Sequence, residues 1–357
     1  MHPAADGLFT ALQTAFAPVL EGRKKRIGFM RAELHPKLAS TFGKHTLRCA
    51  QSFKPDYDLL AQAGLEPSPV LKPRSPMDVI IYLATRNREE NKYMMAKGLS
   101  MLKPGGVFIT AQHNTLGAKH LEKDLSAIAP EVSTHSKKHS RIMMAAKPAE
   151  TESMLEEMYL AYGNPEKVAG TKLLALPGLF SWKKPDTGSQ MLVDMIDPAD
   201  LAGRGADFGA GWGFLSQRAL KMSPRVQEMH LYEAEKLALD ISAQNMALTK
   251  KAQKAKIHAH WADVPNHEIE HKFDFVLCNP PQHNVSSTQA PLAINFIKKA
   301  ASCLKPNGSL WLVTNHHIPA EKHLNKLFSE VEECNRDKQY KVFRAEGLAR
   351  KAKNRKS

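Results

Sequence analysis

The segment around residue 210 constrains the fold of this chain more than any other. A strand-like run, 205–208, leads into three alternating glycines, Gly209, Gly211 and Gly213. Glycine lets a backbone turn tightly and pass close to a ligand, because no Cβ is present to clash. The residues that follow, 214–222, have the composition of a helix. A strand, a glycine turn and a helix in this order predict an α/β fold with a ligand beside the helix N-terminus.

Acidic residues near this turn fit a nucleoside-containing cofactor. Glu233 ends the strand-like run 229–232, about 20 residues beyond the glycines, where a carboxylate can accept both ribose hydroxyls. Asp263 follows the candidate strand 257–261 and is placed to bond an adenine amino group. Asp207 opens the glycine motif. Acidic residues at strand ends are also common in solvated loops, so their combination carries the prediction.

The tetrapeptide Asn279-Pro280-Pro281-Gln282 supplies a second piece of chemistry. It ends the apolar run 273–278, which is typical of a buried parallel strand, so Asn279 falls at the edge where open α/β sheets bind ligands. Taken alone, the tetrapeptide is equally a strand closed by turn formers. With the glycine turn upstream, we interpret it as part of a group-transfer site.

In this order the motifs resemble those of the class I S-adenosylmethionine-dependent ribosomal RNA guanine-N2 methyltransferases, which act on small- or large-subunit RNA. The resemblance covers most of the second half of the chain. Besides the two motifs above it includes residues 176–181, 186–190, 311–315 and 341–345. It implies S-adenosylmethionine as the cofactor and adds Phe180, Gly188 and Gln190 to the residues that enclose it. For Phe180, ordinary core packing is an equally good explanation.

The resemblance also implies how the reaction proceeds. An exocyclic base amine is a poor nucleophile because its lone pair is delocalised into the ring. If the Asn279 side-chain oxygen and the Pro280 carbonyl accept its two N–H bonds, the lone pair turns toward the sulfonium methyl group, and proline rigidity, with Pro281 next in the chain, keeps the second acceptor aimed. We expect direct in-line transfer with no covalent intermediate and no metal site.

The chain departs from the family at Gln282, where an aromatic residue usually stacks on the flipped base. Such stacking contributes about 1 to 3 kcal/mol per base. Phe180, Trp182, Trp212 or His283 could supply a ring instead. His283 matches the family's histidine after the tetrapeptide, where it positions the base or takes its proton; a surface histidine without a catalytic role is an equally good interpretation.

The first half of the chain contains a fainter copy of the second. The run 101–110 parallels 303–312, and 77–82 parallels 273–278, but no glycine turn or paired carbonyl acceptors accompany the first copy. We therefore predict two tandem Rossmann-like class I methyltransferase domains, the N-terminal one degenerate and used for RNA binding or fold support. The predicted boundaries are 1–150 for the degenerate domain, 151–172 for a linker with a helix at 154–162, 173–348 for the catalytic domain, and 349–357 for a basic tail.

Charge and cysteine content indicate the partner and the compartment. A formal net charge of +14, from 50 Lys and Arg against 36 Asp and Glu, favours a polyanion such as ribosomal RNA or a ribosomal subunit. Basic clusters occur at 23–26, 137–141, 250–256 and 350–356. Four widely spaced cysteines form no Cys-x-x-Cys pair, so zinc and disulfides are not expected. With no signal-like start and no long apolar run, we expect a cytoplasmic monomer.

Two other functions use the same sequence features. The Asn-Pro-Pro device also serves adenine N6 and protein glutamine methylation, although the paired domains and basic balance favour RNA. A non-catalytic ribosome assembly protein that kept the fold is the third possibility, which the intact glycine loop opposes. The sequence does not identify the nucleotide or distinguish free RNA from an assembled particle, because both present the same phosphates. An exposed loop guanine in 16S RNA is the expected target, since flipping a paired base costs a few kcal/mol.

Overall fold

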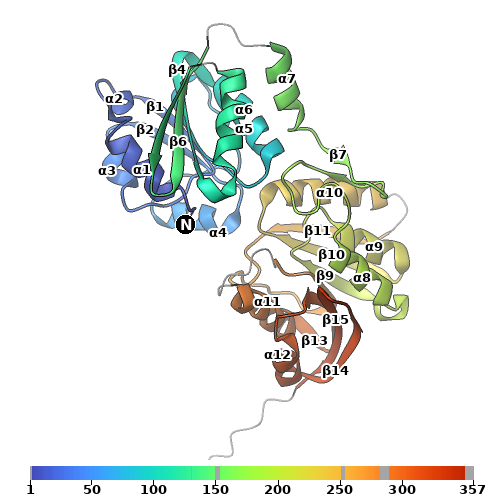
Figure 1. Cartoon of the computed structure of the whole chain (residues 1–357). Helices are drawn as coiled ribbons and strands as arrows, with labels where there is room; N and C mark the ends of the chain where they lie inside the picture. The colour runs from blue at the N-terminus through green and yellow to red at the C-terminus, as the bar shows by residue number, and fades with distance from the viewer. Residues whose placement is uncertain (1, 130, 149–152, 251–253, 282–288, 350–357) are drawn as a thin grey trace, which may run out of the picture. The chain divides into compact units, whose positions relative to one another are not determined.

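The structure is a computed structural model that describes residues 2–129, 131–148, 153–250, 254–281 and 289–349. The chain divides into two compact units (Figure 1). The first comprises Met1–Glu166 and Leu176–Gly178, and the second comprises Lys167–Ala175 and Leu179–Ser357. A two-stranded sheet of β7 (Glu166–Lys167) and β8 (Leu174–Ala175) falls at the division. Within the described residues, no helix is both long and apolar enough to cross a bilayer.

The first unit has a six-stranded sheet in the order β2-β1-β3-β4-β6-β5, with β2, β1, β3 and β4 parallel and β6 antiparallel to both its neighbours. Its elements are α1 (Ala5–Gln13), α2 (Ala17–Leu20), β1 (Arg26–Met30), α3 (Leu38–Phe42), β2 (Thr46–Ala50), α4 (Lys54–Gln62), β3 (Met77–Leu83), α5 (Arg88–Ser100), β4 (Leu102–His113), η1 (Asn114–Leu116), α6 (Ala118–Ile128), β5 (Val132–Lys137), β6 (Ser140–Ala146) and α7 (Ser153–Ala161).

The second unit has a seven-stranded sheet in the order β11-β10-β9-β12-β13-β15-β14, parallel as far as β13 and antiparallel at β15. Its further elements are α8 (Thr187–Met195), η2 (Pro198–Asp200), β9 (Gly203–Phe208), α9 (Phe214–Met222), β10 (Val226–Glu233), α10 (Lys236–Lys250), β11 (Lys256–Trp261), β12 (Phe273–Cys278), α11 (Gln289–Cys303), β13 (Leu304–Asn315), α12 (Ala320–Leu327), β14 (Phe328–Arg336) and β15 (Tyr340–Leu348). The strands predicted at 205–208, 229–232, 257–261 and 273–278 all form, and α9 has the predicted bounds.

The two sheets repeat one another in register as well as in order. In the first unit Met77 pairs with Leu102, and the register then shifts so that Val79 pairs with Val107. In the second unit Phe273 pairs with Leu304, and the same shift brings Phe275 opposite Ser309. Because an irregularity at one matching position is hard to obtain by chance, it supports an internal repeat. The prediction of two related α/β units of the class I methyltransferase type is confirmed.

Side chains pair with one another at the carboxyl ends of the first unit's strands. Arg31 follows β1 with a φ of 50°, and its Nε donates to Glu90 Oε1 at 2.9 Å. The other Glu90 oxygen accepts from the Thr85 hydroxyl at 2.8 Å. Asn91 Oδ1 accepts from the Tyr82 hydroxyl at 2.8 Å. The place that the second unit gives to a glycine loop therefore carries a bonded polar network here, as a degenerate domain predicts.

The helix predicted at 154–162 forms as α7 and packs on α5 of the first unit. The Lys92 ammonium lies over the Tyr159 ring, 5.0 Å from its centroid. Gly163 abuts Tyr93 so closely that an added Cβ would come within 2.3 Å of that ring. The helix ends before the expected Gly163-Asn164-Pro165 stop. Part of the segment expected to be a linker therefore packs as the last helix of the first unit.

Candidate active site

The glycine loop leaves β9 in the left-handed region of backbone space. Gly209, Gly211 and Gly213 have φ values of 80°, 54° and 89°, which favour glycine at all three positions. Their surroundings differ. An added Cβ would meet nothing within 4 Å at Gly211, whereas at Gly213 it would lie 3.0 Å from the Met246 side chain on α10. Gly211 therefore faces open space, and Gly213 allows α9 to pack against α10.

Asp207 lies beneath this loop. Its carboxylate Oδ2 accepts from the backbone N–H and the hydroxyl of Ser216, at 3.0 and 2.7 Å, in the first turn of α9. Oδ1 is buried and has no hydrogen-bond partner among the described residues. Burial raises the pKa of Asp207 to about 7. The residue predicted to bind cofactor thus first holds the loop and helix together, while one oxygen is left unsatisfied.

Glu233 and Asp263 end neighbouring strands on the same edge. Glu233 accepts from the Gly211 N–H through Oε2 and from the Glu235 N–H through Oε1, both at 2.8 Å. Burial raises the pKa of Glu233. Asp263 follows β11, is half-buried, and accepts from the Asn266 side-chain amide at 2.7 Å. Glu233 is directly linked to the glycine loop, so the two predicted cofactor elements are brought together.

The Asn279 side chain has a fixed orientation at the end of β12. Its Nδ2 donates to Asp186 Oδ2 at 3.0 Å and to Ser189 Oγ at 2.8 Å. Asp186 is also the N-cap of α8, since Oδ2 accepts from the Ser189 N–H at 2.9 Å. Both hydrogens of the amide are therefore directed at α8, which turns the carbonyl oxygen to the other side. Sequence reasoning quoted the 186–190 motif but gave Asp186 and Ser189 no part in holding Asn279.

The remaining predicted catalytic residues follow Asn279 directly. Pro280 is buried and Pro281 is exposed. Gln282 and His283 lie outside the described residues.

The residues predicted from the 176–190 region separate into two groups. Phe180 has a ring that is 43 % exposed, and its carbonyl accepts from the Trp212 indole N–H at 2.9 Å. Gly188 is buried, where an added Cβ would lie 2.9 Å from the Tyr340 ring. Gln190 donates to Asp194 at 2.7 Å one helical turn further along α8. Phe180 is thus joined to the glycine loop, while Gly188 and Gln190 have packing and helix-surface contacts.

A small hollow of about 40 Å³ unites the two motifs at the carboxyl ends of β9 and β12. It is lined by Phe180, Ser181, Asp186, Ser189, Gly209, Ala210, Gly211, Trp212, Phe214, Leu215 and Asn279. Ordinary small-molecule pockets measure about 300–1,000 Å³, so a bound cofactor has to widen this one.

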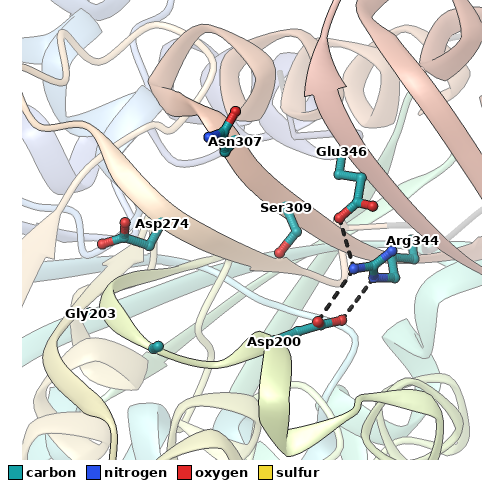
Figure 2. A pocket seen from close by; sticks show the side chains of 8 residues that line it. Asp200, Gly203, Asp274, Asn307, Ser309, Arg344 and Glu346 are labelled. Carbon is teal, nitrogen blue, oxygen red and sulfur yellow. Dashed lines mark hydrogen bonds and ion pairs between the residues drawn. The ribbon is translucent and has the colours of Figure 1, made fainter.

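A larger hollow of about 370 Å³ lies at the opposite, amino ends of these strands (Figure 2). There the Arg344 guanidinium on β15 is bonded to Asp200 at 2.8 Å and to Glu346 at 2.7 Å, and Asp274 lies on β12, on the far side of β13. Open α/β sheets bind their ligands at the carboxyl ends of the strands, and the larger hollow contains neither the glycine loop nor Asn279. We therefore assign the chemistry to the smaller one.

The residues of the smaller hollow fit S-adenosylmethionine. The open space at Gly211 can admit a ligand against the backbone, and the unsatisfied Asp207 oxygen lies under the same loop. The Glu233 carboxylate, which is bonded to the Gly211 N–H of that loop, can accept hydrogen bonds from ribose hydroxyls. A cofactor with a positively charged sulfur and amino group suits a hollow whose lining includes the acidic Asp186.

Comparison with known proteins agrees with this geometry. Residues 170–344 match the family model of the methyltransferase small domain. The chain belongs to this family of methyltransferases. Curated relatives include the ribosomal RNA small subunit methyltransferase C of Salmonella newport (strain SL254) and that of Salmonella typhi. Each is 26 % identical over 267 residues, covering 75 % of this chain and 75 % of the relative.

A solved structure extends the agreement to both units. The T. thermophilus 16S rRNA N2 G1207 methyltransferase, in complex with AdoMet and guanosine, has a TM-score of 0.75 and 20 % identity. It covers 96 % of this chain, which covers 92 % of it, so the fold is shared along nearly the whole length. The prediction of a methyltransferase family from the sequence motifs is confirmed.

Proposed function

We propose that this methyltransferase transfers a methyl group from S-adenosylmethionine to the exocyclic N2 of a guanine in ribosomal RNA of the small subunit. The observation that carries the proposal is the Asn279 amide, oriented by Asp186 and Ser189 beside the glycine loop. Its relatives' names, the small subunit methyltransferases of Salmonella, favour the same substrate.

The chain's contribution to the reaction is orientation. S-adenosylmethionine supplies an activated methyl group on a positively charged sulfur. The Asn279 oxygen and the Pro280 carbonyl accept the two N–H bonds of the guanine amine, which turns the nitrogen lone pair out of the ring. With the cofactor bound, that nitrogen would take the methyl group, S-adenosylhomocysteine would leave, and the proton of the amine would pass to water. Because Asn279 is already held at its amide nitrogen, little reorganisation is needed at the moment of transfer.

Phe180 is the best placed of the described aromatic residues to stack on the base. Phe180 lines the hollow and is 43 % exposed, whereas Trp212 is only 4 % exposed and donates its indole N–H to the Phe180 carbonyl. Stacking on Phe180 would replace the aromatic residue that Gln282 displaces from the tetrapeptide. The net charge of +14 supports binding to RNA phosphates. We also propose that the protein acts as a monomer in the cytoplasm.

A methyl-transfer assay tests the function. The full chain would be incubated with S-adenosylmethionine carrying a labelled methyl group and with small subunits, stripped 16S RNA, large subunits or a protein substrate, the particles coming from a strain without this enzyme. Digestion and mass spectrometry should find N2-methylguanosine in small-subunit RNA. Label in N6-methyladenosine, in protein glutamine or in large-subunit RNA would contradict the proposal.

Substitution of Asn279 tests the mechanism within that assay. Asn279→Ala should lower turnover at least about a hundredfold, because it removes one aimed acceptor of the transition state. Cofactor affinity should stay within several-fold, since the glycine loop and Glu233 remain. A matched control is Asp194→Ala on the same helix α8, whose carboxylate accepts from the Gln190 side chain. Equal turnover of Asn279→Ala and the parent chain would refute the assigned role.

A further inference from the structure

A group of histidines lies on one face of the two strands at the edge of the second sheet. β10 and β11 are parallel, with His230 opposite His258 and Tyr232 opposite His260. Side chains on a strand alternate between faces, so Glu228 and His230 on β10 share a face with His258 and His260 on β11. The imidazole rings of His230 and His258 stack with their centroids 4.4 Å apart.

His230 is the central member, and one of its ring nitrogens is unsatisfied. The residue is 1 % exposed. Its Nδ1 lies 3.0 Å from His260 Nε2, within hydrogen-bond distance, whereas its Nε2 is buried with no hydrogen-bond partner among the described residues. Glu228 Oε2 is 3.6 Å from that Nε2. Burial and the neighbouring histidines lower the pKa of His230 to about 4, so the ring is neutral at pH 7.

We propose that Glu228, His230 and His258 bind a divalent transition-metal ion, for which Zn²⁺ is the best fit. One carboxylate oxygen and one ring nitrogen from each histidine lie within 4.8 Å of one another. Two imidazoles and a carboxylate are a donor set that zinc accepts in tetrahedral sites, with water in the fourth position. The His230–His260 contact completes the arrangement, because a ligating histidine commonly donates its other N–H to a second partner that fixes its orientation.

The surroundings limit the affinity of this site. Zinc bonds of about 2.0–2.2 Å place tetrahedral ligand atoms about 3.4 Å apart, so the three side chains must draw in from their present positions. Arg204 Nε donates to Glu228 Oε2 at 2.6 Å and has to share that carboxylate with the metal. The His271 ring lies 4.8 Å from His230 between centroids and is the nearest further imidazole. We expect an affinity below that of a closed structural zinc site.

The metal would act on the fold and not on methyl transfer. Glu228 lies toward the amino end of β10, whereas Glu233, which serves the glycine loop, is at its carboxyl end. A metal bound by β10 and β11 together would fasten the edge strand to the sheet. A metal that binds only the folded chain stabilises it, and the gain grows with the logarithm of the ratio of free metal to its dissociation constant.

Binding of zinc to the tag-free, chelator-treated full chain tests the proposal. Isothermal titration with ZnCl2 should find one saturable equivalent per chain and a raised melting temperature. Cobalt(II) in place of zinc should give the absorption of a four- or five-coordinate ion. His258→Gln and Glu228→Gln should each weaken zinc binding at least tenfold, whereas His317→Gln, an exposed histidine elsewhere in the same unit, should not.

Two results would overturn the site. One is the lack of a saturable equivalent in the parent chain. The other is equal zinc affinity of His258→Gln and the parent, because the metal would then be bound elsewhere. His258 and Glu228 are both only half-buried, so circular dichroism of each variant can confirm that it remains folded.

Discussion

At the scale of single residues, one carboxylate controls the orientation of the amide that is proposed to hold the substrate. Asp186→Ala removes a hydrogen bond to Asn279 and the N-cap of α8 together. We expect turnover to fall at least about tenfold with cofactor affinity within several-fold, and stability to fall by about 1 kcal/mol from the lost cap. Asp186→Asn should restore most of the turnover, because its oxygen can accept the same two bonds.

A second capping aspartate provides the control. Asp197 caps η2, the short helix that precedes β9, through the Ala199 N–H at 2.7 Å. Asp197→Ala should therefore lower the melting temperature without lowering turnover. If both variants lose turnover equally, the effect of Asp186 would be one of stability and not of orientation.

Asp207 gives the protein a specific dependence of stability on pH. Burial raises its pKa from the usual 3.8 to about 7. Because the folded state binds this proton more tightly than the unfolded state, the contribution of Asp207 is fully present below about pH 4 and is lost as the pH rises to about 7. Asp207→Asn removes the titration. Between pH 5 and pH 8 the free energy of unfolding of the variant should therefore rise relative to that of the parent by up to about 2 kcal/mol. Its melting temperature should rise relative to the parent over the same range.

Thermal melts of both proteins across that range in the absence of cofactor measure the effect. Parallel curves for parent and variant would show that Asp207 does not titrate in this window.

Residue contacts between distant segments explain what sequence reasoning missed. The spacing of Asn279 after β12 predicted its place at the sheet edge, but its partner Asp186 lies 93 positions away in the chain. Only the packing of α8 brings them together. The histidine group is similar, because its members fall on two strands and meet only through the register of β10 and β11. The sequence prediction about metal binding rested on the spacing of the cysteines. It did not consider which histidine and glutamate side chains share a face of two neighbouring strands.

At the scale of elements, two glycines of the glycine loop have different roles that the sequence does not distinguish: Gly211 leaves room for a ligand, and Gly213 allows two helices to pack. Gly211→Ala places a methyl group in open space, whereas Gly213→Ala drives one into Met246 and Ser242 on α10. Each substitution costs about 1–3 kcal/mol of backbone strain in the left-handed region. We expect Gly213→Ala to lower the melting temperature more, and Gly211→Ala to lose more cofactor affinity.

Melting temperatures and cofactor titrations of the two variants test this, and each variant is the control for the other. The opposite ranking in cofactor affinity would place the ligand away from Gly211.

Strands and helices of the second unit were predictable where their apolar pattern is continuous. β12 is a run of six residues whose bounds match the prediction, because five of its side chains are buried in the core. The linker was harder to predict. A helical pattern followed by a stop signal predicts a helix but not the element on which it packs. The contacts that attach α7 and the residues after it to the first unit, Lys92 with Tyr159 and Gly163 with Tyr93, join residues far apart in the sequence.

At the scale of the whole molecule, the two units share a fold, but of the two only the second has the glycine loop and the other residues predicted to bind the cofactor. The matching register shifts in β3–β4 and β12–β13 support an internal repeat of one fold. In the first unit, however, Arg31 and Glu90 occupy the strand ends with their own bonds. We propose that this unit, freed from cofactor binding, presents its surface to RNA and that its exposed basic residues make positioning contacts to phosphate.

The excess of basic residues over the whole chain predicts a steep salt dependence. Each phosphate neutralised by Lys or Arg releases counterions, and six to ten such contacts lower affinity by about 10³–10⁵ between 50 and 200 mM salt. With a net charge of +14, we expect affinity for 16S RNA to fall at least about a hundredfold over this range, while cofactor affinity changes little. Filter binding at a series of KCl concentrations measures the slope.

Single substitutions then show whether the first unit supplies part of that slope. Lys24 is exposed within the basic cluster 23–26, whereas Lys103 of the same unit is paired with Asp78 at 2.7 Å. Lys24→Ala should lower the salt slope by about 1, as expected for the loss of one phosphate contact, and Lys103→Ala should leave it unchanged. An unaltered slope in Lys24→Ala would remove this cluster from the RNA interface, and a salt-independent affinity of the parent chain would mean that charge does not drive the association.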